Sequence, residues 1–355
     1  MNEKQGVRPG NQLISLGILF ALIAISFYVI FRNFSEIDPR TIGGILRGVQ
    51  PGFLALALLC LFLYILTEGV SMCVLSGALG HPYGFVKTVV YSAIDLYFSA
   101  ITPSATGGQP AVAYYMAQDG IPLTKSTTLL LANLIQYTAS LLFMGLIVLI
   151  IKPGLVLAGG KWILILFIIG VVLHVGMLVA FALCMFRQKM IRRLAGAVLH
   201  LLCKLRLVKN EEERLAAFDQ QLLEYHECVV LVHKRPGLLL SVFIGNILQR
   251  VAMFSIAYFV YRALGLSAHS YWELMAVQIV IALAVNSLPL PGAVGAAEAA
   301  FLMLYTIIYS QEFLMPAMLL TRGVSYYLCF ILCGIITIVN HIITMKTQRK
   351  AREVC

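Results

Sequence analysis

Charged residues are scarce in this sequence. Asp, Glu, Lys and Arg make up 12% of the 355 residues, whereas 60% are hydrophobic. Soluble domains carry about 25% charged residues. The low charge therefore excludes a water-soluble domain as the main body of the chain and indicates a protein that lies in a lipid bilayer.

Recognisable catalytic, metal and cofactor motifs are also lacking. The sequence has neither a Gly-x-x-x-x-Gly-Lys-Ser/Thr loop nor a His-Glu-x-x-His pattern. Its eight cysteines and seven histidines show no disulfide framework and no metal-ligand spacing. We predict no catalytic residue, no metal site and no cofactor. The net charge of +10 comes from basic residues beside the apolar runs, so we expect a membrane partner and no nucleic acid.

Long apolar runs fill most of the chain. A helix needs about 20 apolar residues to cross the hydrocarbon core, and runs without strand-like alternation favour helices over a barrel. We read the first run, Leu13–Phe31, as a retained span, because no small-residue cleavage site follows it before Arg32. The fold class is therefore all-α, a polytopic transmembrane helical bundle. The approximate apolar segments are 12–32, 53–79, 84–102, 124–151, 162–186, 237–263, 271–288, 297–310 and 313–343.

Two short Gly/Pro loops interrupt the apolar runs and match each other. Four identities recur at a constant offset of 188: Ser99/Ser287, Pro103/Pro291, Ala105/Ala293 and Gly107/Gly295. Each loop ends one apolar segment and precedes another helix. We therefore predict two inverted-repeat halves, each with a re-entrant Gly/Pro hairpin, at about 84–120 and 271–310. Many transporters are built from such repeats with broken helices.

The predicted organisation follows from these hairpins and from the basic segments. A first transmembrane half covers 1–186, a basic cytoplasmic amphipathic segment 187–236, a second half 237–345 and a basic cytoplasmic tail 346–355. Two hairpins leave six full crossings, so both termini would be cytoplasmic. A fully threaded arrangement with an external N-terminus is the alternative, because Arg32, Arg40 and Arg47 favour a cytoplasmic first loop.

The segment 187–236 itself has two interpretations. Ile191, Leu194, Val198, Leu201 and Leu205 recur at helical spacing among basic residues. This pattern is typical of an interfacial helix lying on anionic lipid. A helical hairpin packed against the bundle explains it equally well.

Polar groups inside the apolar segments are the candidate site, because each costs free energy unless it is paired or lines a wet cavity. A guanidinium suits a lipid phosphate, so we predict that Arg250 and Arg322 bind a lipid headgroup. The alternative is a structural ion pair with Glu298, Asp95 or Glu68. The other predicted headgroup residues are Glu298, Gln109, Asn133, Gln136, Asn246 and Gln249. The predicted gate residues, where glycine permits sharp turns, are Pro103, Gly107, Gly108, Pro291, Gly292 and Gly295.

The two loops carry a family resemblance. Thr102-Pro-Ser-Ala-Thr-Gly-Gly-Gln-Pro110 and Leu288-Pro-Leu-Pro-Gly-Ala-Val-Gly-Ala-Ala-Glu-Ala-Ala300 resemble the signature loops of the lysylphosphatidylglycerol synthase transmembrane region. This is the flippase part of the bacterial multiple peptide resistance factor, and it also exists as stand-alone membrane proteins. Glu298 and Arg322 match the family. Gln109 stands where the family often has Glu, and Val112 and Ala297 stand where it often has Arg.

The resemblance implies lipid handling in the bacterial cytoplasmic membrane. It implies movement of an aminoacylated or other phospholipid between leaflets, with a role in lipid metabolism and antibiotic resistance. The polar stretch 187–235 is too short to house a tRNA-dependent lysyltransferase. Two alternatives remain: the membrane component of a phosphatidylglycerol lysyltransferase acting with a separate soluble transferase, and a small-solute transporter. A homo-oligomer is a further possible partner.

Overall fold

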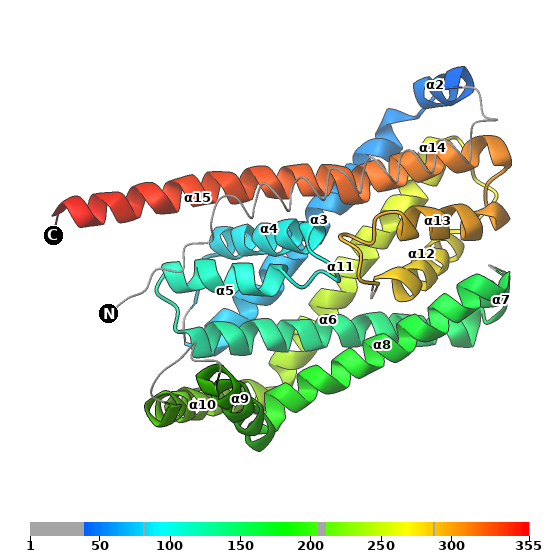
Figure 1. The fold of residues 1–355 in the computed structure, drawn as a ribbon. Coiled ribbons are helices and arrows are strands. Elements are labelled where there is room, and N and C mark those ends of the chain that lie inside the picture. Colours follow the sequence, from blue (N-terminus) through cyan, green and yellow to red (C-terminus); the bar gives the residue numbers. More distant parts are fainter. Residues whose placement is uncertain (1–38, 81, 159, 205–210, 287, 355) are drawn as a thin grey trace.

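The computed structural model describes residues 39–80, 82–158, 160–204, 211–286 and 288–354, which form a helical bundle (Figure 1). The predicted first span, Leu13–Phe31, lies outside these residues. In chain order the elements are α2 (Pro39–Arg47), α3 (Pro51–Ala78), α4 (Phe85–Ile101), α5 (Gly108–Gln118), α6 (Leu123–Ile151), α7 (Gly154–Ala158), α8 (Gly160–Phe186), α9 (Gln188–Lys204), α10 (Glu211–His233), α11 (Pro236–Ala263), α12 (Tyr271–Val285), α13 (Ala296–Leu304), the 3-10 turn η1 (Tyr305–Ile307), α14 (Gln311–Arg322), the π-helical segment η2 (Gly323–Leu328) and α15 (Cys329–Val354). The prediction of an all-α polytopic membrane protein is confirmed.

Five helices of the described chain are long and apolar enough to cross a membrane. They are α3, α6, α8, α11 and the combined helix Gln311–Lys346, with 27 to 36 residues each. Pro51 and Pro236 begin α3 and α11, because proline lacks the N–H group that a first helical residue leaves unpaired in any case. The six-crossing arrangement stays a prediction, because its first span lies outside the described residues.

Two pairs of shorter helices lie between these spans. The α4–α5 hairpin has arms of 17 and 11 residues, and the α12–α13 hairpin has arms of 15 and 9 residues. At about 1.5 Å per residue none of these arms reaches across about 30 Å of hydrocarbon. Figure 1 shows the hairpins entering from opposite ends of the bundle, with their loops turned towards its middle.

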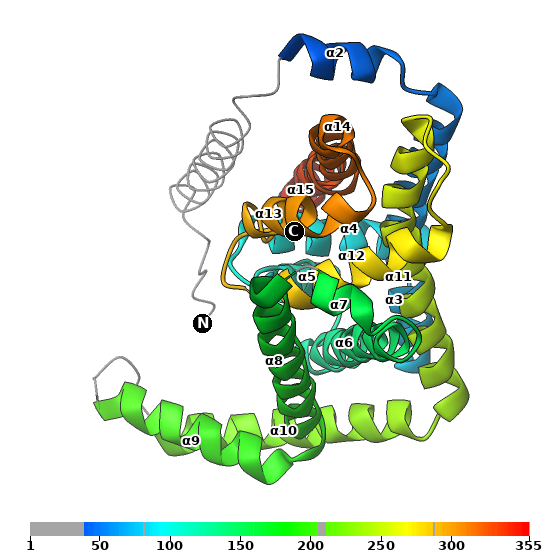
Figure 2. The same ribbon diagram turned by 90° about the vertical axis from the view of Figure 1, so that its right-hand side faces the viewer.

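The segment α9–α10 is a helical hairpin at one end of the bundle, roughly perpendicular to α6 and α8 (Figure 2). Tyr225, Val229 and Val232 of α10 are buried in the hydrophobic cluster that includes residues of α5 and α6. Arg192 of α9 binds Asp219 of α10 through two hydrogen bonds of 2.7 and 2.8 Å. These hydrogen bonds lower the pKa of the Asp219 carboxyl. The packing agrees with the hairpin interpretation of this segment.

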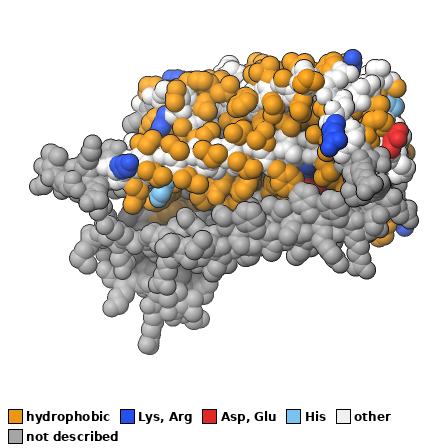
Figure 3. Space-filling view, turned by 90° about the horizontal axis from the view of Figure 1, so that it is seen from above, with side chains coloured by type: hydrophobic (Ala, Val, Ile, Leu, Met, Phe, Trp, Pro, Cys, Tyr) orange, Lys and Arg blue, Asp and Glu red, His pale blue; other side chains and the backbone are white. Residues whose placement is uncertain are grey.

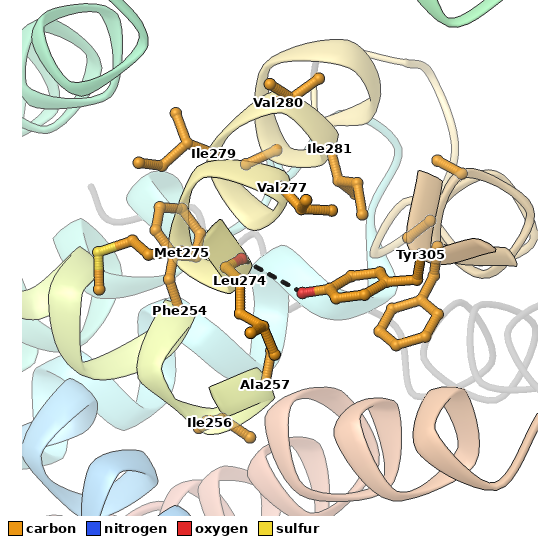
Figure 4. Close-up of a cluster of buried hydrophobic side chains, with 14 of the residues drawn as sticks. Phe254, Ile256, Ala257, Leu274, Met275, Val277, Ile279, Val280, Ile281 and Tyr305 are labelled. Atoms are coloured by element: carbon orange, nitrogen blue, oxygen red, sulfur yellow. Dashed lines mark hydrogen bonds between the residues drawn. The ribbon is translucent and has the colours of Figure 1, made fainter. Parts of the chain in front are cut away.

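The interior of the bundle is densely apolar. Figure 4 shows Tyr305 among buried apolar side chains such as Leu274 and Val277, with its hydroxyl donating to the Leu274 carbonyl oxygen. A Cβ atom at Gly170 would overlap the backbone of Leu283, so glycine allows α8 and α12 to approach closely.

The outer surface is apolar as well. Side chains of α8 such as Ile168, Val172 and Val179 are exposed. On the face in Figure 3, apolar side chains cover most of the described surface and charged side chains gather towards its two ends. This distribution fits a body surrounded by lipid, with both ends in water.

Candidate functional site at the hairpin tips

The two hairpin loops share their backbone conformation over residues 104–105 and 292–293 but not at the next matched glycine, where φ is −83° at Gly107 and +84° at Gly295. Ser104 and Ala105 have φ of 51° and 54°, and their equivalents at the offset of 188, Gly292 and Ala293, have 56° and 51°. The hydrogen bonds also repeat. The N–H groups of Ala105 and Ala293 donate to the residues three positions earlier, at 3.2 and 3.1 Å. The sequence match therefore corresponds to a repeated local structure.

The loops also contact each other. Pro103 and Pro291 form an isolated antiparallel bridge, and the Ser104 hydroxyl lies 3.4 Å from the Leu288 carbonyl oxygen. An antiparallel contact between two equivalent residues is what a local twofold axis produces. The two loops that hold the predicted gate residues therefore meet, and at this contact Pro291 is buried whereas Pro103 is exposed.

Glu298 and Arg322 form an ion pair beside the second loop. Arg322 Nε donates to Glu298 Oε1 at 2.8 Å, and the Glu298 side chain is 1% exposed. Glu298 Oε2 accepts the Gly295 N–H at 2.7 Å and so caps the first turn of α13. The alternative proposed for Arg322, a structural ion pair, is thus present. Its Nη2 is buried without a hydrogen-bond partner, so a donor is left for an anion.

Tyr326 connects the two hairpins and is a residue that the sequence did not single out. Its hydroxyl donates to the Ala100 carbonyl oxygen of α4 at 3.2 Å, and its ring occupies the space that a Cβ atom at Gly292 would need. The Arg322 guanidinium lies 4.6 Å from the ring centroid. The π-helical turn η2 holds Tyr326, and such turns are frequent at functional sites. The sequence did offer one indication of this residue: Tyr326 follows Arg322 by four positions, a spacing that places two side chains on the same face of a helix.

Arg250 lies on α11 and faces α6. Its side chain donates to the Ser140 hydroxyl at 2.9 Å and to the Tyr137 carbonyl oxygen at 2.6 Å. The guanidinium also stacks on the Tyr137 ring, 3.8 Å from the centroid. Arg250 is 3% exposed. Within the described residues it has no acidic partner, so the alternative of an ion pair does not apply to it.

The predicted amide side chains form a second polar group nearby. Asn246 Nδ2 donates to Asn133 Oδ1 at 3.3 Å, which joins α11 to α6. Gln249 Nε2 donates to Glu68 Oε2 at 3.3 Å. The side-chain oxygens of the two donating amides, Asn246 Oδ1 and Gln249 Oε1, are buried without hydrogen-bond partners. Gln136 is half-buried on α6.

Gln109 belongs to the first hairpin and contacts an acidic residue. Its Nε2 donates to Asp95 Oδ2 at 2.9 Å, and a Cβ atom at the preceding Gly108 would overlap Asp95 and Ser99. The predicted residues therefore fall into three groups: the paired loops with Glu298 and Arg322, Arg250 of α11 bound to α6, and the amides beside the acidic residues. Tyr64 interacts electrostatically with both Glu68 and Arg250, which connects the last two groups.

The site and fold define a polytopic α-helical membrane protein with two short-helix hairpins whose loops contact each other. The lysylphosphatidylglycerol synthase TM region matches residues 13–333, and the chain belongs to this family. It is also similar to a UPF0104 membrane protein of Archaeoglobus fulgidus, with 24% identity over 312 residues that cover 86% of this chain and 92% of the relative.

Proposed function

We propose that the protein is a phospholipid translocase. The α4–α5 and α12–α13 hairpins are its two gates, and Arg250 and Arg322 bind the headgroup phosphate, with Glu298, Gln109, Asn133, Gln136, Asn246 and Gln249 around it. The observation that supports this most is the contact between Pro103 and Pro291, which joins the loops of the two hairpins. Broken helices bring polar backbone to a depth where a continuous helix would expose only side chains.

The site as described is closed. Arg250 and Glu298 are 3% and 1% exposed, so a headgroup reaches them only after the hairpins separate. A buried arginine without a carboxylate partner is costly in a membrane. A lipid phosphate that replaces the Ser140 and Tyr137 contacts of Arg250 would supply the missing negative charge. We propose an aminoacylated phosphatidylglycerol or a related phospholipid as the substrate.

The orientation proposed here puts α9–α10 and the C-terminal end of α15 in the cytoplasm of a bacterial cell. Figure 1 places both at the same end of the bundle, from which the α4–α5 hairpin also enters. Both segments are rich in Lys and Arg, which favours the cytoplasmic side. The first gate would then open inwards and the second outwards.

A reversible cross-link between the gates tests this proposal. Antiparallel pairs have Cα separations of about 4.5–5.5 Å, which suits a disulfide. In a background without the native cysteines, Pro103→Cys/Pro291→Cys should block flipping of fluorescent phosphatidylglycerol in liposomes when oxidised, and reductant should restore it. Pro103→Cys alone should not respond to reductant. Flipping that continues through a fully formed cross-link would exclude the hairpins as gates.

The proposed role of Arg250 in headgroup binding is tested by a separate experiment. Arg250→Gln should lose most of the flipping rate, and Arg250→Lys should retain part of it because the charge remains. Arg262→Gln is the matched control, since Arg262 lies in the last turn of the same helix and outside the proposed site. Equal rates for Arg250→Gln and Arg262→Gln, with both variants folded, would remove Arg250 from the headgroup site.

A further inference from the structure

Two acidic side chains are buried side by side next to the first hairpin. Glu68 of α3 and Asp95 of α4 are 5% and 7% exposed, and their carboxyl groups are close enough to interact with each other. Ionised carboxyl groups only accept hydrogen bonds. Two neighbouring carboxyl groups can therefore hydrogen-bond to each other only when one of them carries a proton.

The other partners of this pair are neutral. Glu68 Oε2 accepts from the Ser92 hydroxyl at 3.0 Å and from Gln249 Nε2 at 3.3 Å. Asp95 accepts from Ser99 at 3.4 Å and from Gln109 at 2.9 Å. These donors stabilise one negative charge, and two carboxylates in contact do not both ionise readily.

The titratable groups that face the pair do not neutralise it. Tyr64 lies on α3 itself, Cys329 and Cys333 face Glu68 from α15, and Arg250 lies beyond Tyr64 on α11. Arg250 is engaged by Tyr137 and Ser140 on α6. Among the described residues no cation forms an ion pair with either carboxyl, so a proton is the available counter-charge.

An unpartnered acceptor lies at the same place. Gln249 is 2% exposed, its Nε2 contacts Glu68, and its Oε1 has no hydrogen-bond partner. A buried amide oxygen without a donor is unfavourable. Gln249 already contacts Glu68 through Nε2, so a protonated Glu68 would place a donor on the residue that this amide binds.

The pair also supports the base of the first gate. Gln109 binds Asp95, and Gly108, the first residue of α5, packs directly on Asp95 and Ser99. Loss of the shared proton would leave a second buried negative charge, which water reaches only if α5 moves away. We propose that Glu68 and Asp95 form a proton-binding site whose occupancy controls the α4–α5 hairpin; this control rests on the proposed translocase function.

Proton binding is tested without any lipid movement. Infrared difference spectra of the full chain in nanodiscs, recorded during a pH titration, should contain the carbonyl stretch of a protonated carboxyl group. Glu68→Gln and Asp95→Asn should each lose this titrating band. Glu312→Gln should retain it, because Glu312 is exposed in the first turn of α14. A band that survives both substitutions overturns the proton site, as does loss of the band on replacing K⁺ by Na⁺ at constant pH.

Control of the hairpin is tested by flipping at equal pH on both sides of the liposome. The wild-type rate should vary several-fold between about pH 5 and pH 9, and Glu312→Gln should follow it. Glu68→Gln, which is uncharged at every pH, should flatten the profile. An unchanged profile in Glu68→Gln overturns the control of the hairpin. Absence of flipping in every protein, with the infrared band present, refutes the translocase and the proposed control but leaves the proton site in place.

Discussion

In the α12–α13 hairpin, a glutamate after the loop is paired with an arginine, whereas in the α4–α5 hairpin an aspartate before the loop contacts another carboxyl group. The equivalent positions do not carry the same charges. At the offset of 188, Glu298 corresponds to Pro110, and Asp95 corresponds to Leu283, which is buried among apolar side chains. The backbone of the loops is repeated over residues 104–105 and 292–293, but the charges around the loops are not.

The comparison shows that the backbone conformation of a loop and the charges beside it depend on different residues. Hydrogen bonds within each loop and the residues at positive φ set the backbone. The buried charges are neutralised in different ways, by an arginine in one half and by a proton in the other. In the proposed translocase, the two gates would therefore be controlled by different charged groups.

The largest expected effect comes from removing the charge that balances Arg322. Glu298→Gln leaves a largely buried guanidinium unpaired, which typically costs about 3–5 kcal/mol. The loss should appear as a strongly lowered melting temperature in detergent. Glu273→Gln breaks the exposed Lys152–Glu273 pair, whose side chains are 41% and 35% exposed, and should cost at most about 1 kcal/mol. Equal losses in the two variants would show that Glu298 is not an essential counter-charge.

The glycines beside the two loops should matter for different reasons. Gly292→Ala forces a side chain onto φ of +56° and into the Tyr326 ring, and strained positive φ costs about 1–3 kcal/mol. Gly108→Ala has no φ penalty, but its Cβ atom would overlap the backbone oxygen of Asp95. Both variants should unfold at lower temperature than Gly176→Ala, because a Cβ atom at Gly176 meets nothing within 4 Å. A Gly292→Ala protein as stable as wild type would contradict the contact with Tyr326.

The smallest expected effect tests whether the two loops have the same backbone conformation at Ala105 and Ala293. Ala105 and Ala293 both have positive φ, which is unfavourable for any residue with a Cβ atom. Ala105→Gly and Ala293→Gly should each raise the free energy of unfolding, by up to about 1 kcal/mol. Ala299→Gly, on an exposed helical position of α13, should lower it by a similar amount. If one loop variant raised the free energy of unfolding and the other lowered it, Ala105 and Ala293 would not be structurally equivalent.

Much of the architecture was predictable from the pattern of apolar residues. The predicted segment 124–151 agrees with α6, Leu123–Ile151, to within one residue, and the segment 84–102 contains α4. Backbone groups in lipid must bond within their own segment, so composition and length fix the helices almost alone. The break in the last span was not predicted, because the π-helical turn at Gly323–Leu328 interrupts no apolar pattern.

The candidate site was predicted only in part. Arg250 and Arg322 were selected as rare charges in apolar helices, which needs no knowledge of neighbours. Their partners were undetermined: Arg322 pairs with Glu298, 24 positions away, whereas Arg250 binds Ser140 and Tyr137 more than 100 positions away. The contact of Glu68 with Asp95 is another case in which helix packing, and not spacing, creates the chemistry.

The sequence by itself determined the helices, their crossing of a membrane, the two matched Gly/Pro breaks and the family, because local composition and turn chemistry govern each of these. Only the tertiary structure decided that the breaks meet at Pro103 and Pro291, that Tyr326 connects them, and which buried charge has a partner. Hydropathy records how deep a residue lies in the bilayer. The identity of the side chain opposite depends on how the helices are rotated and packed against one another, and no single segment encodes that.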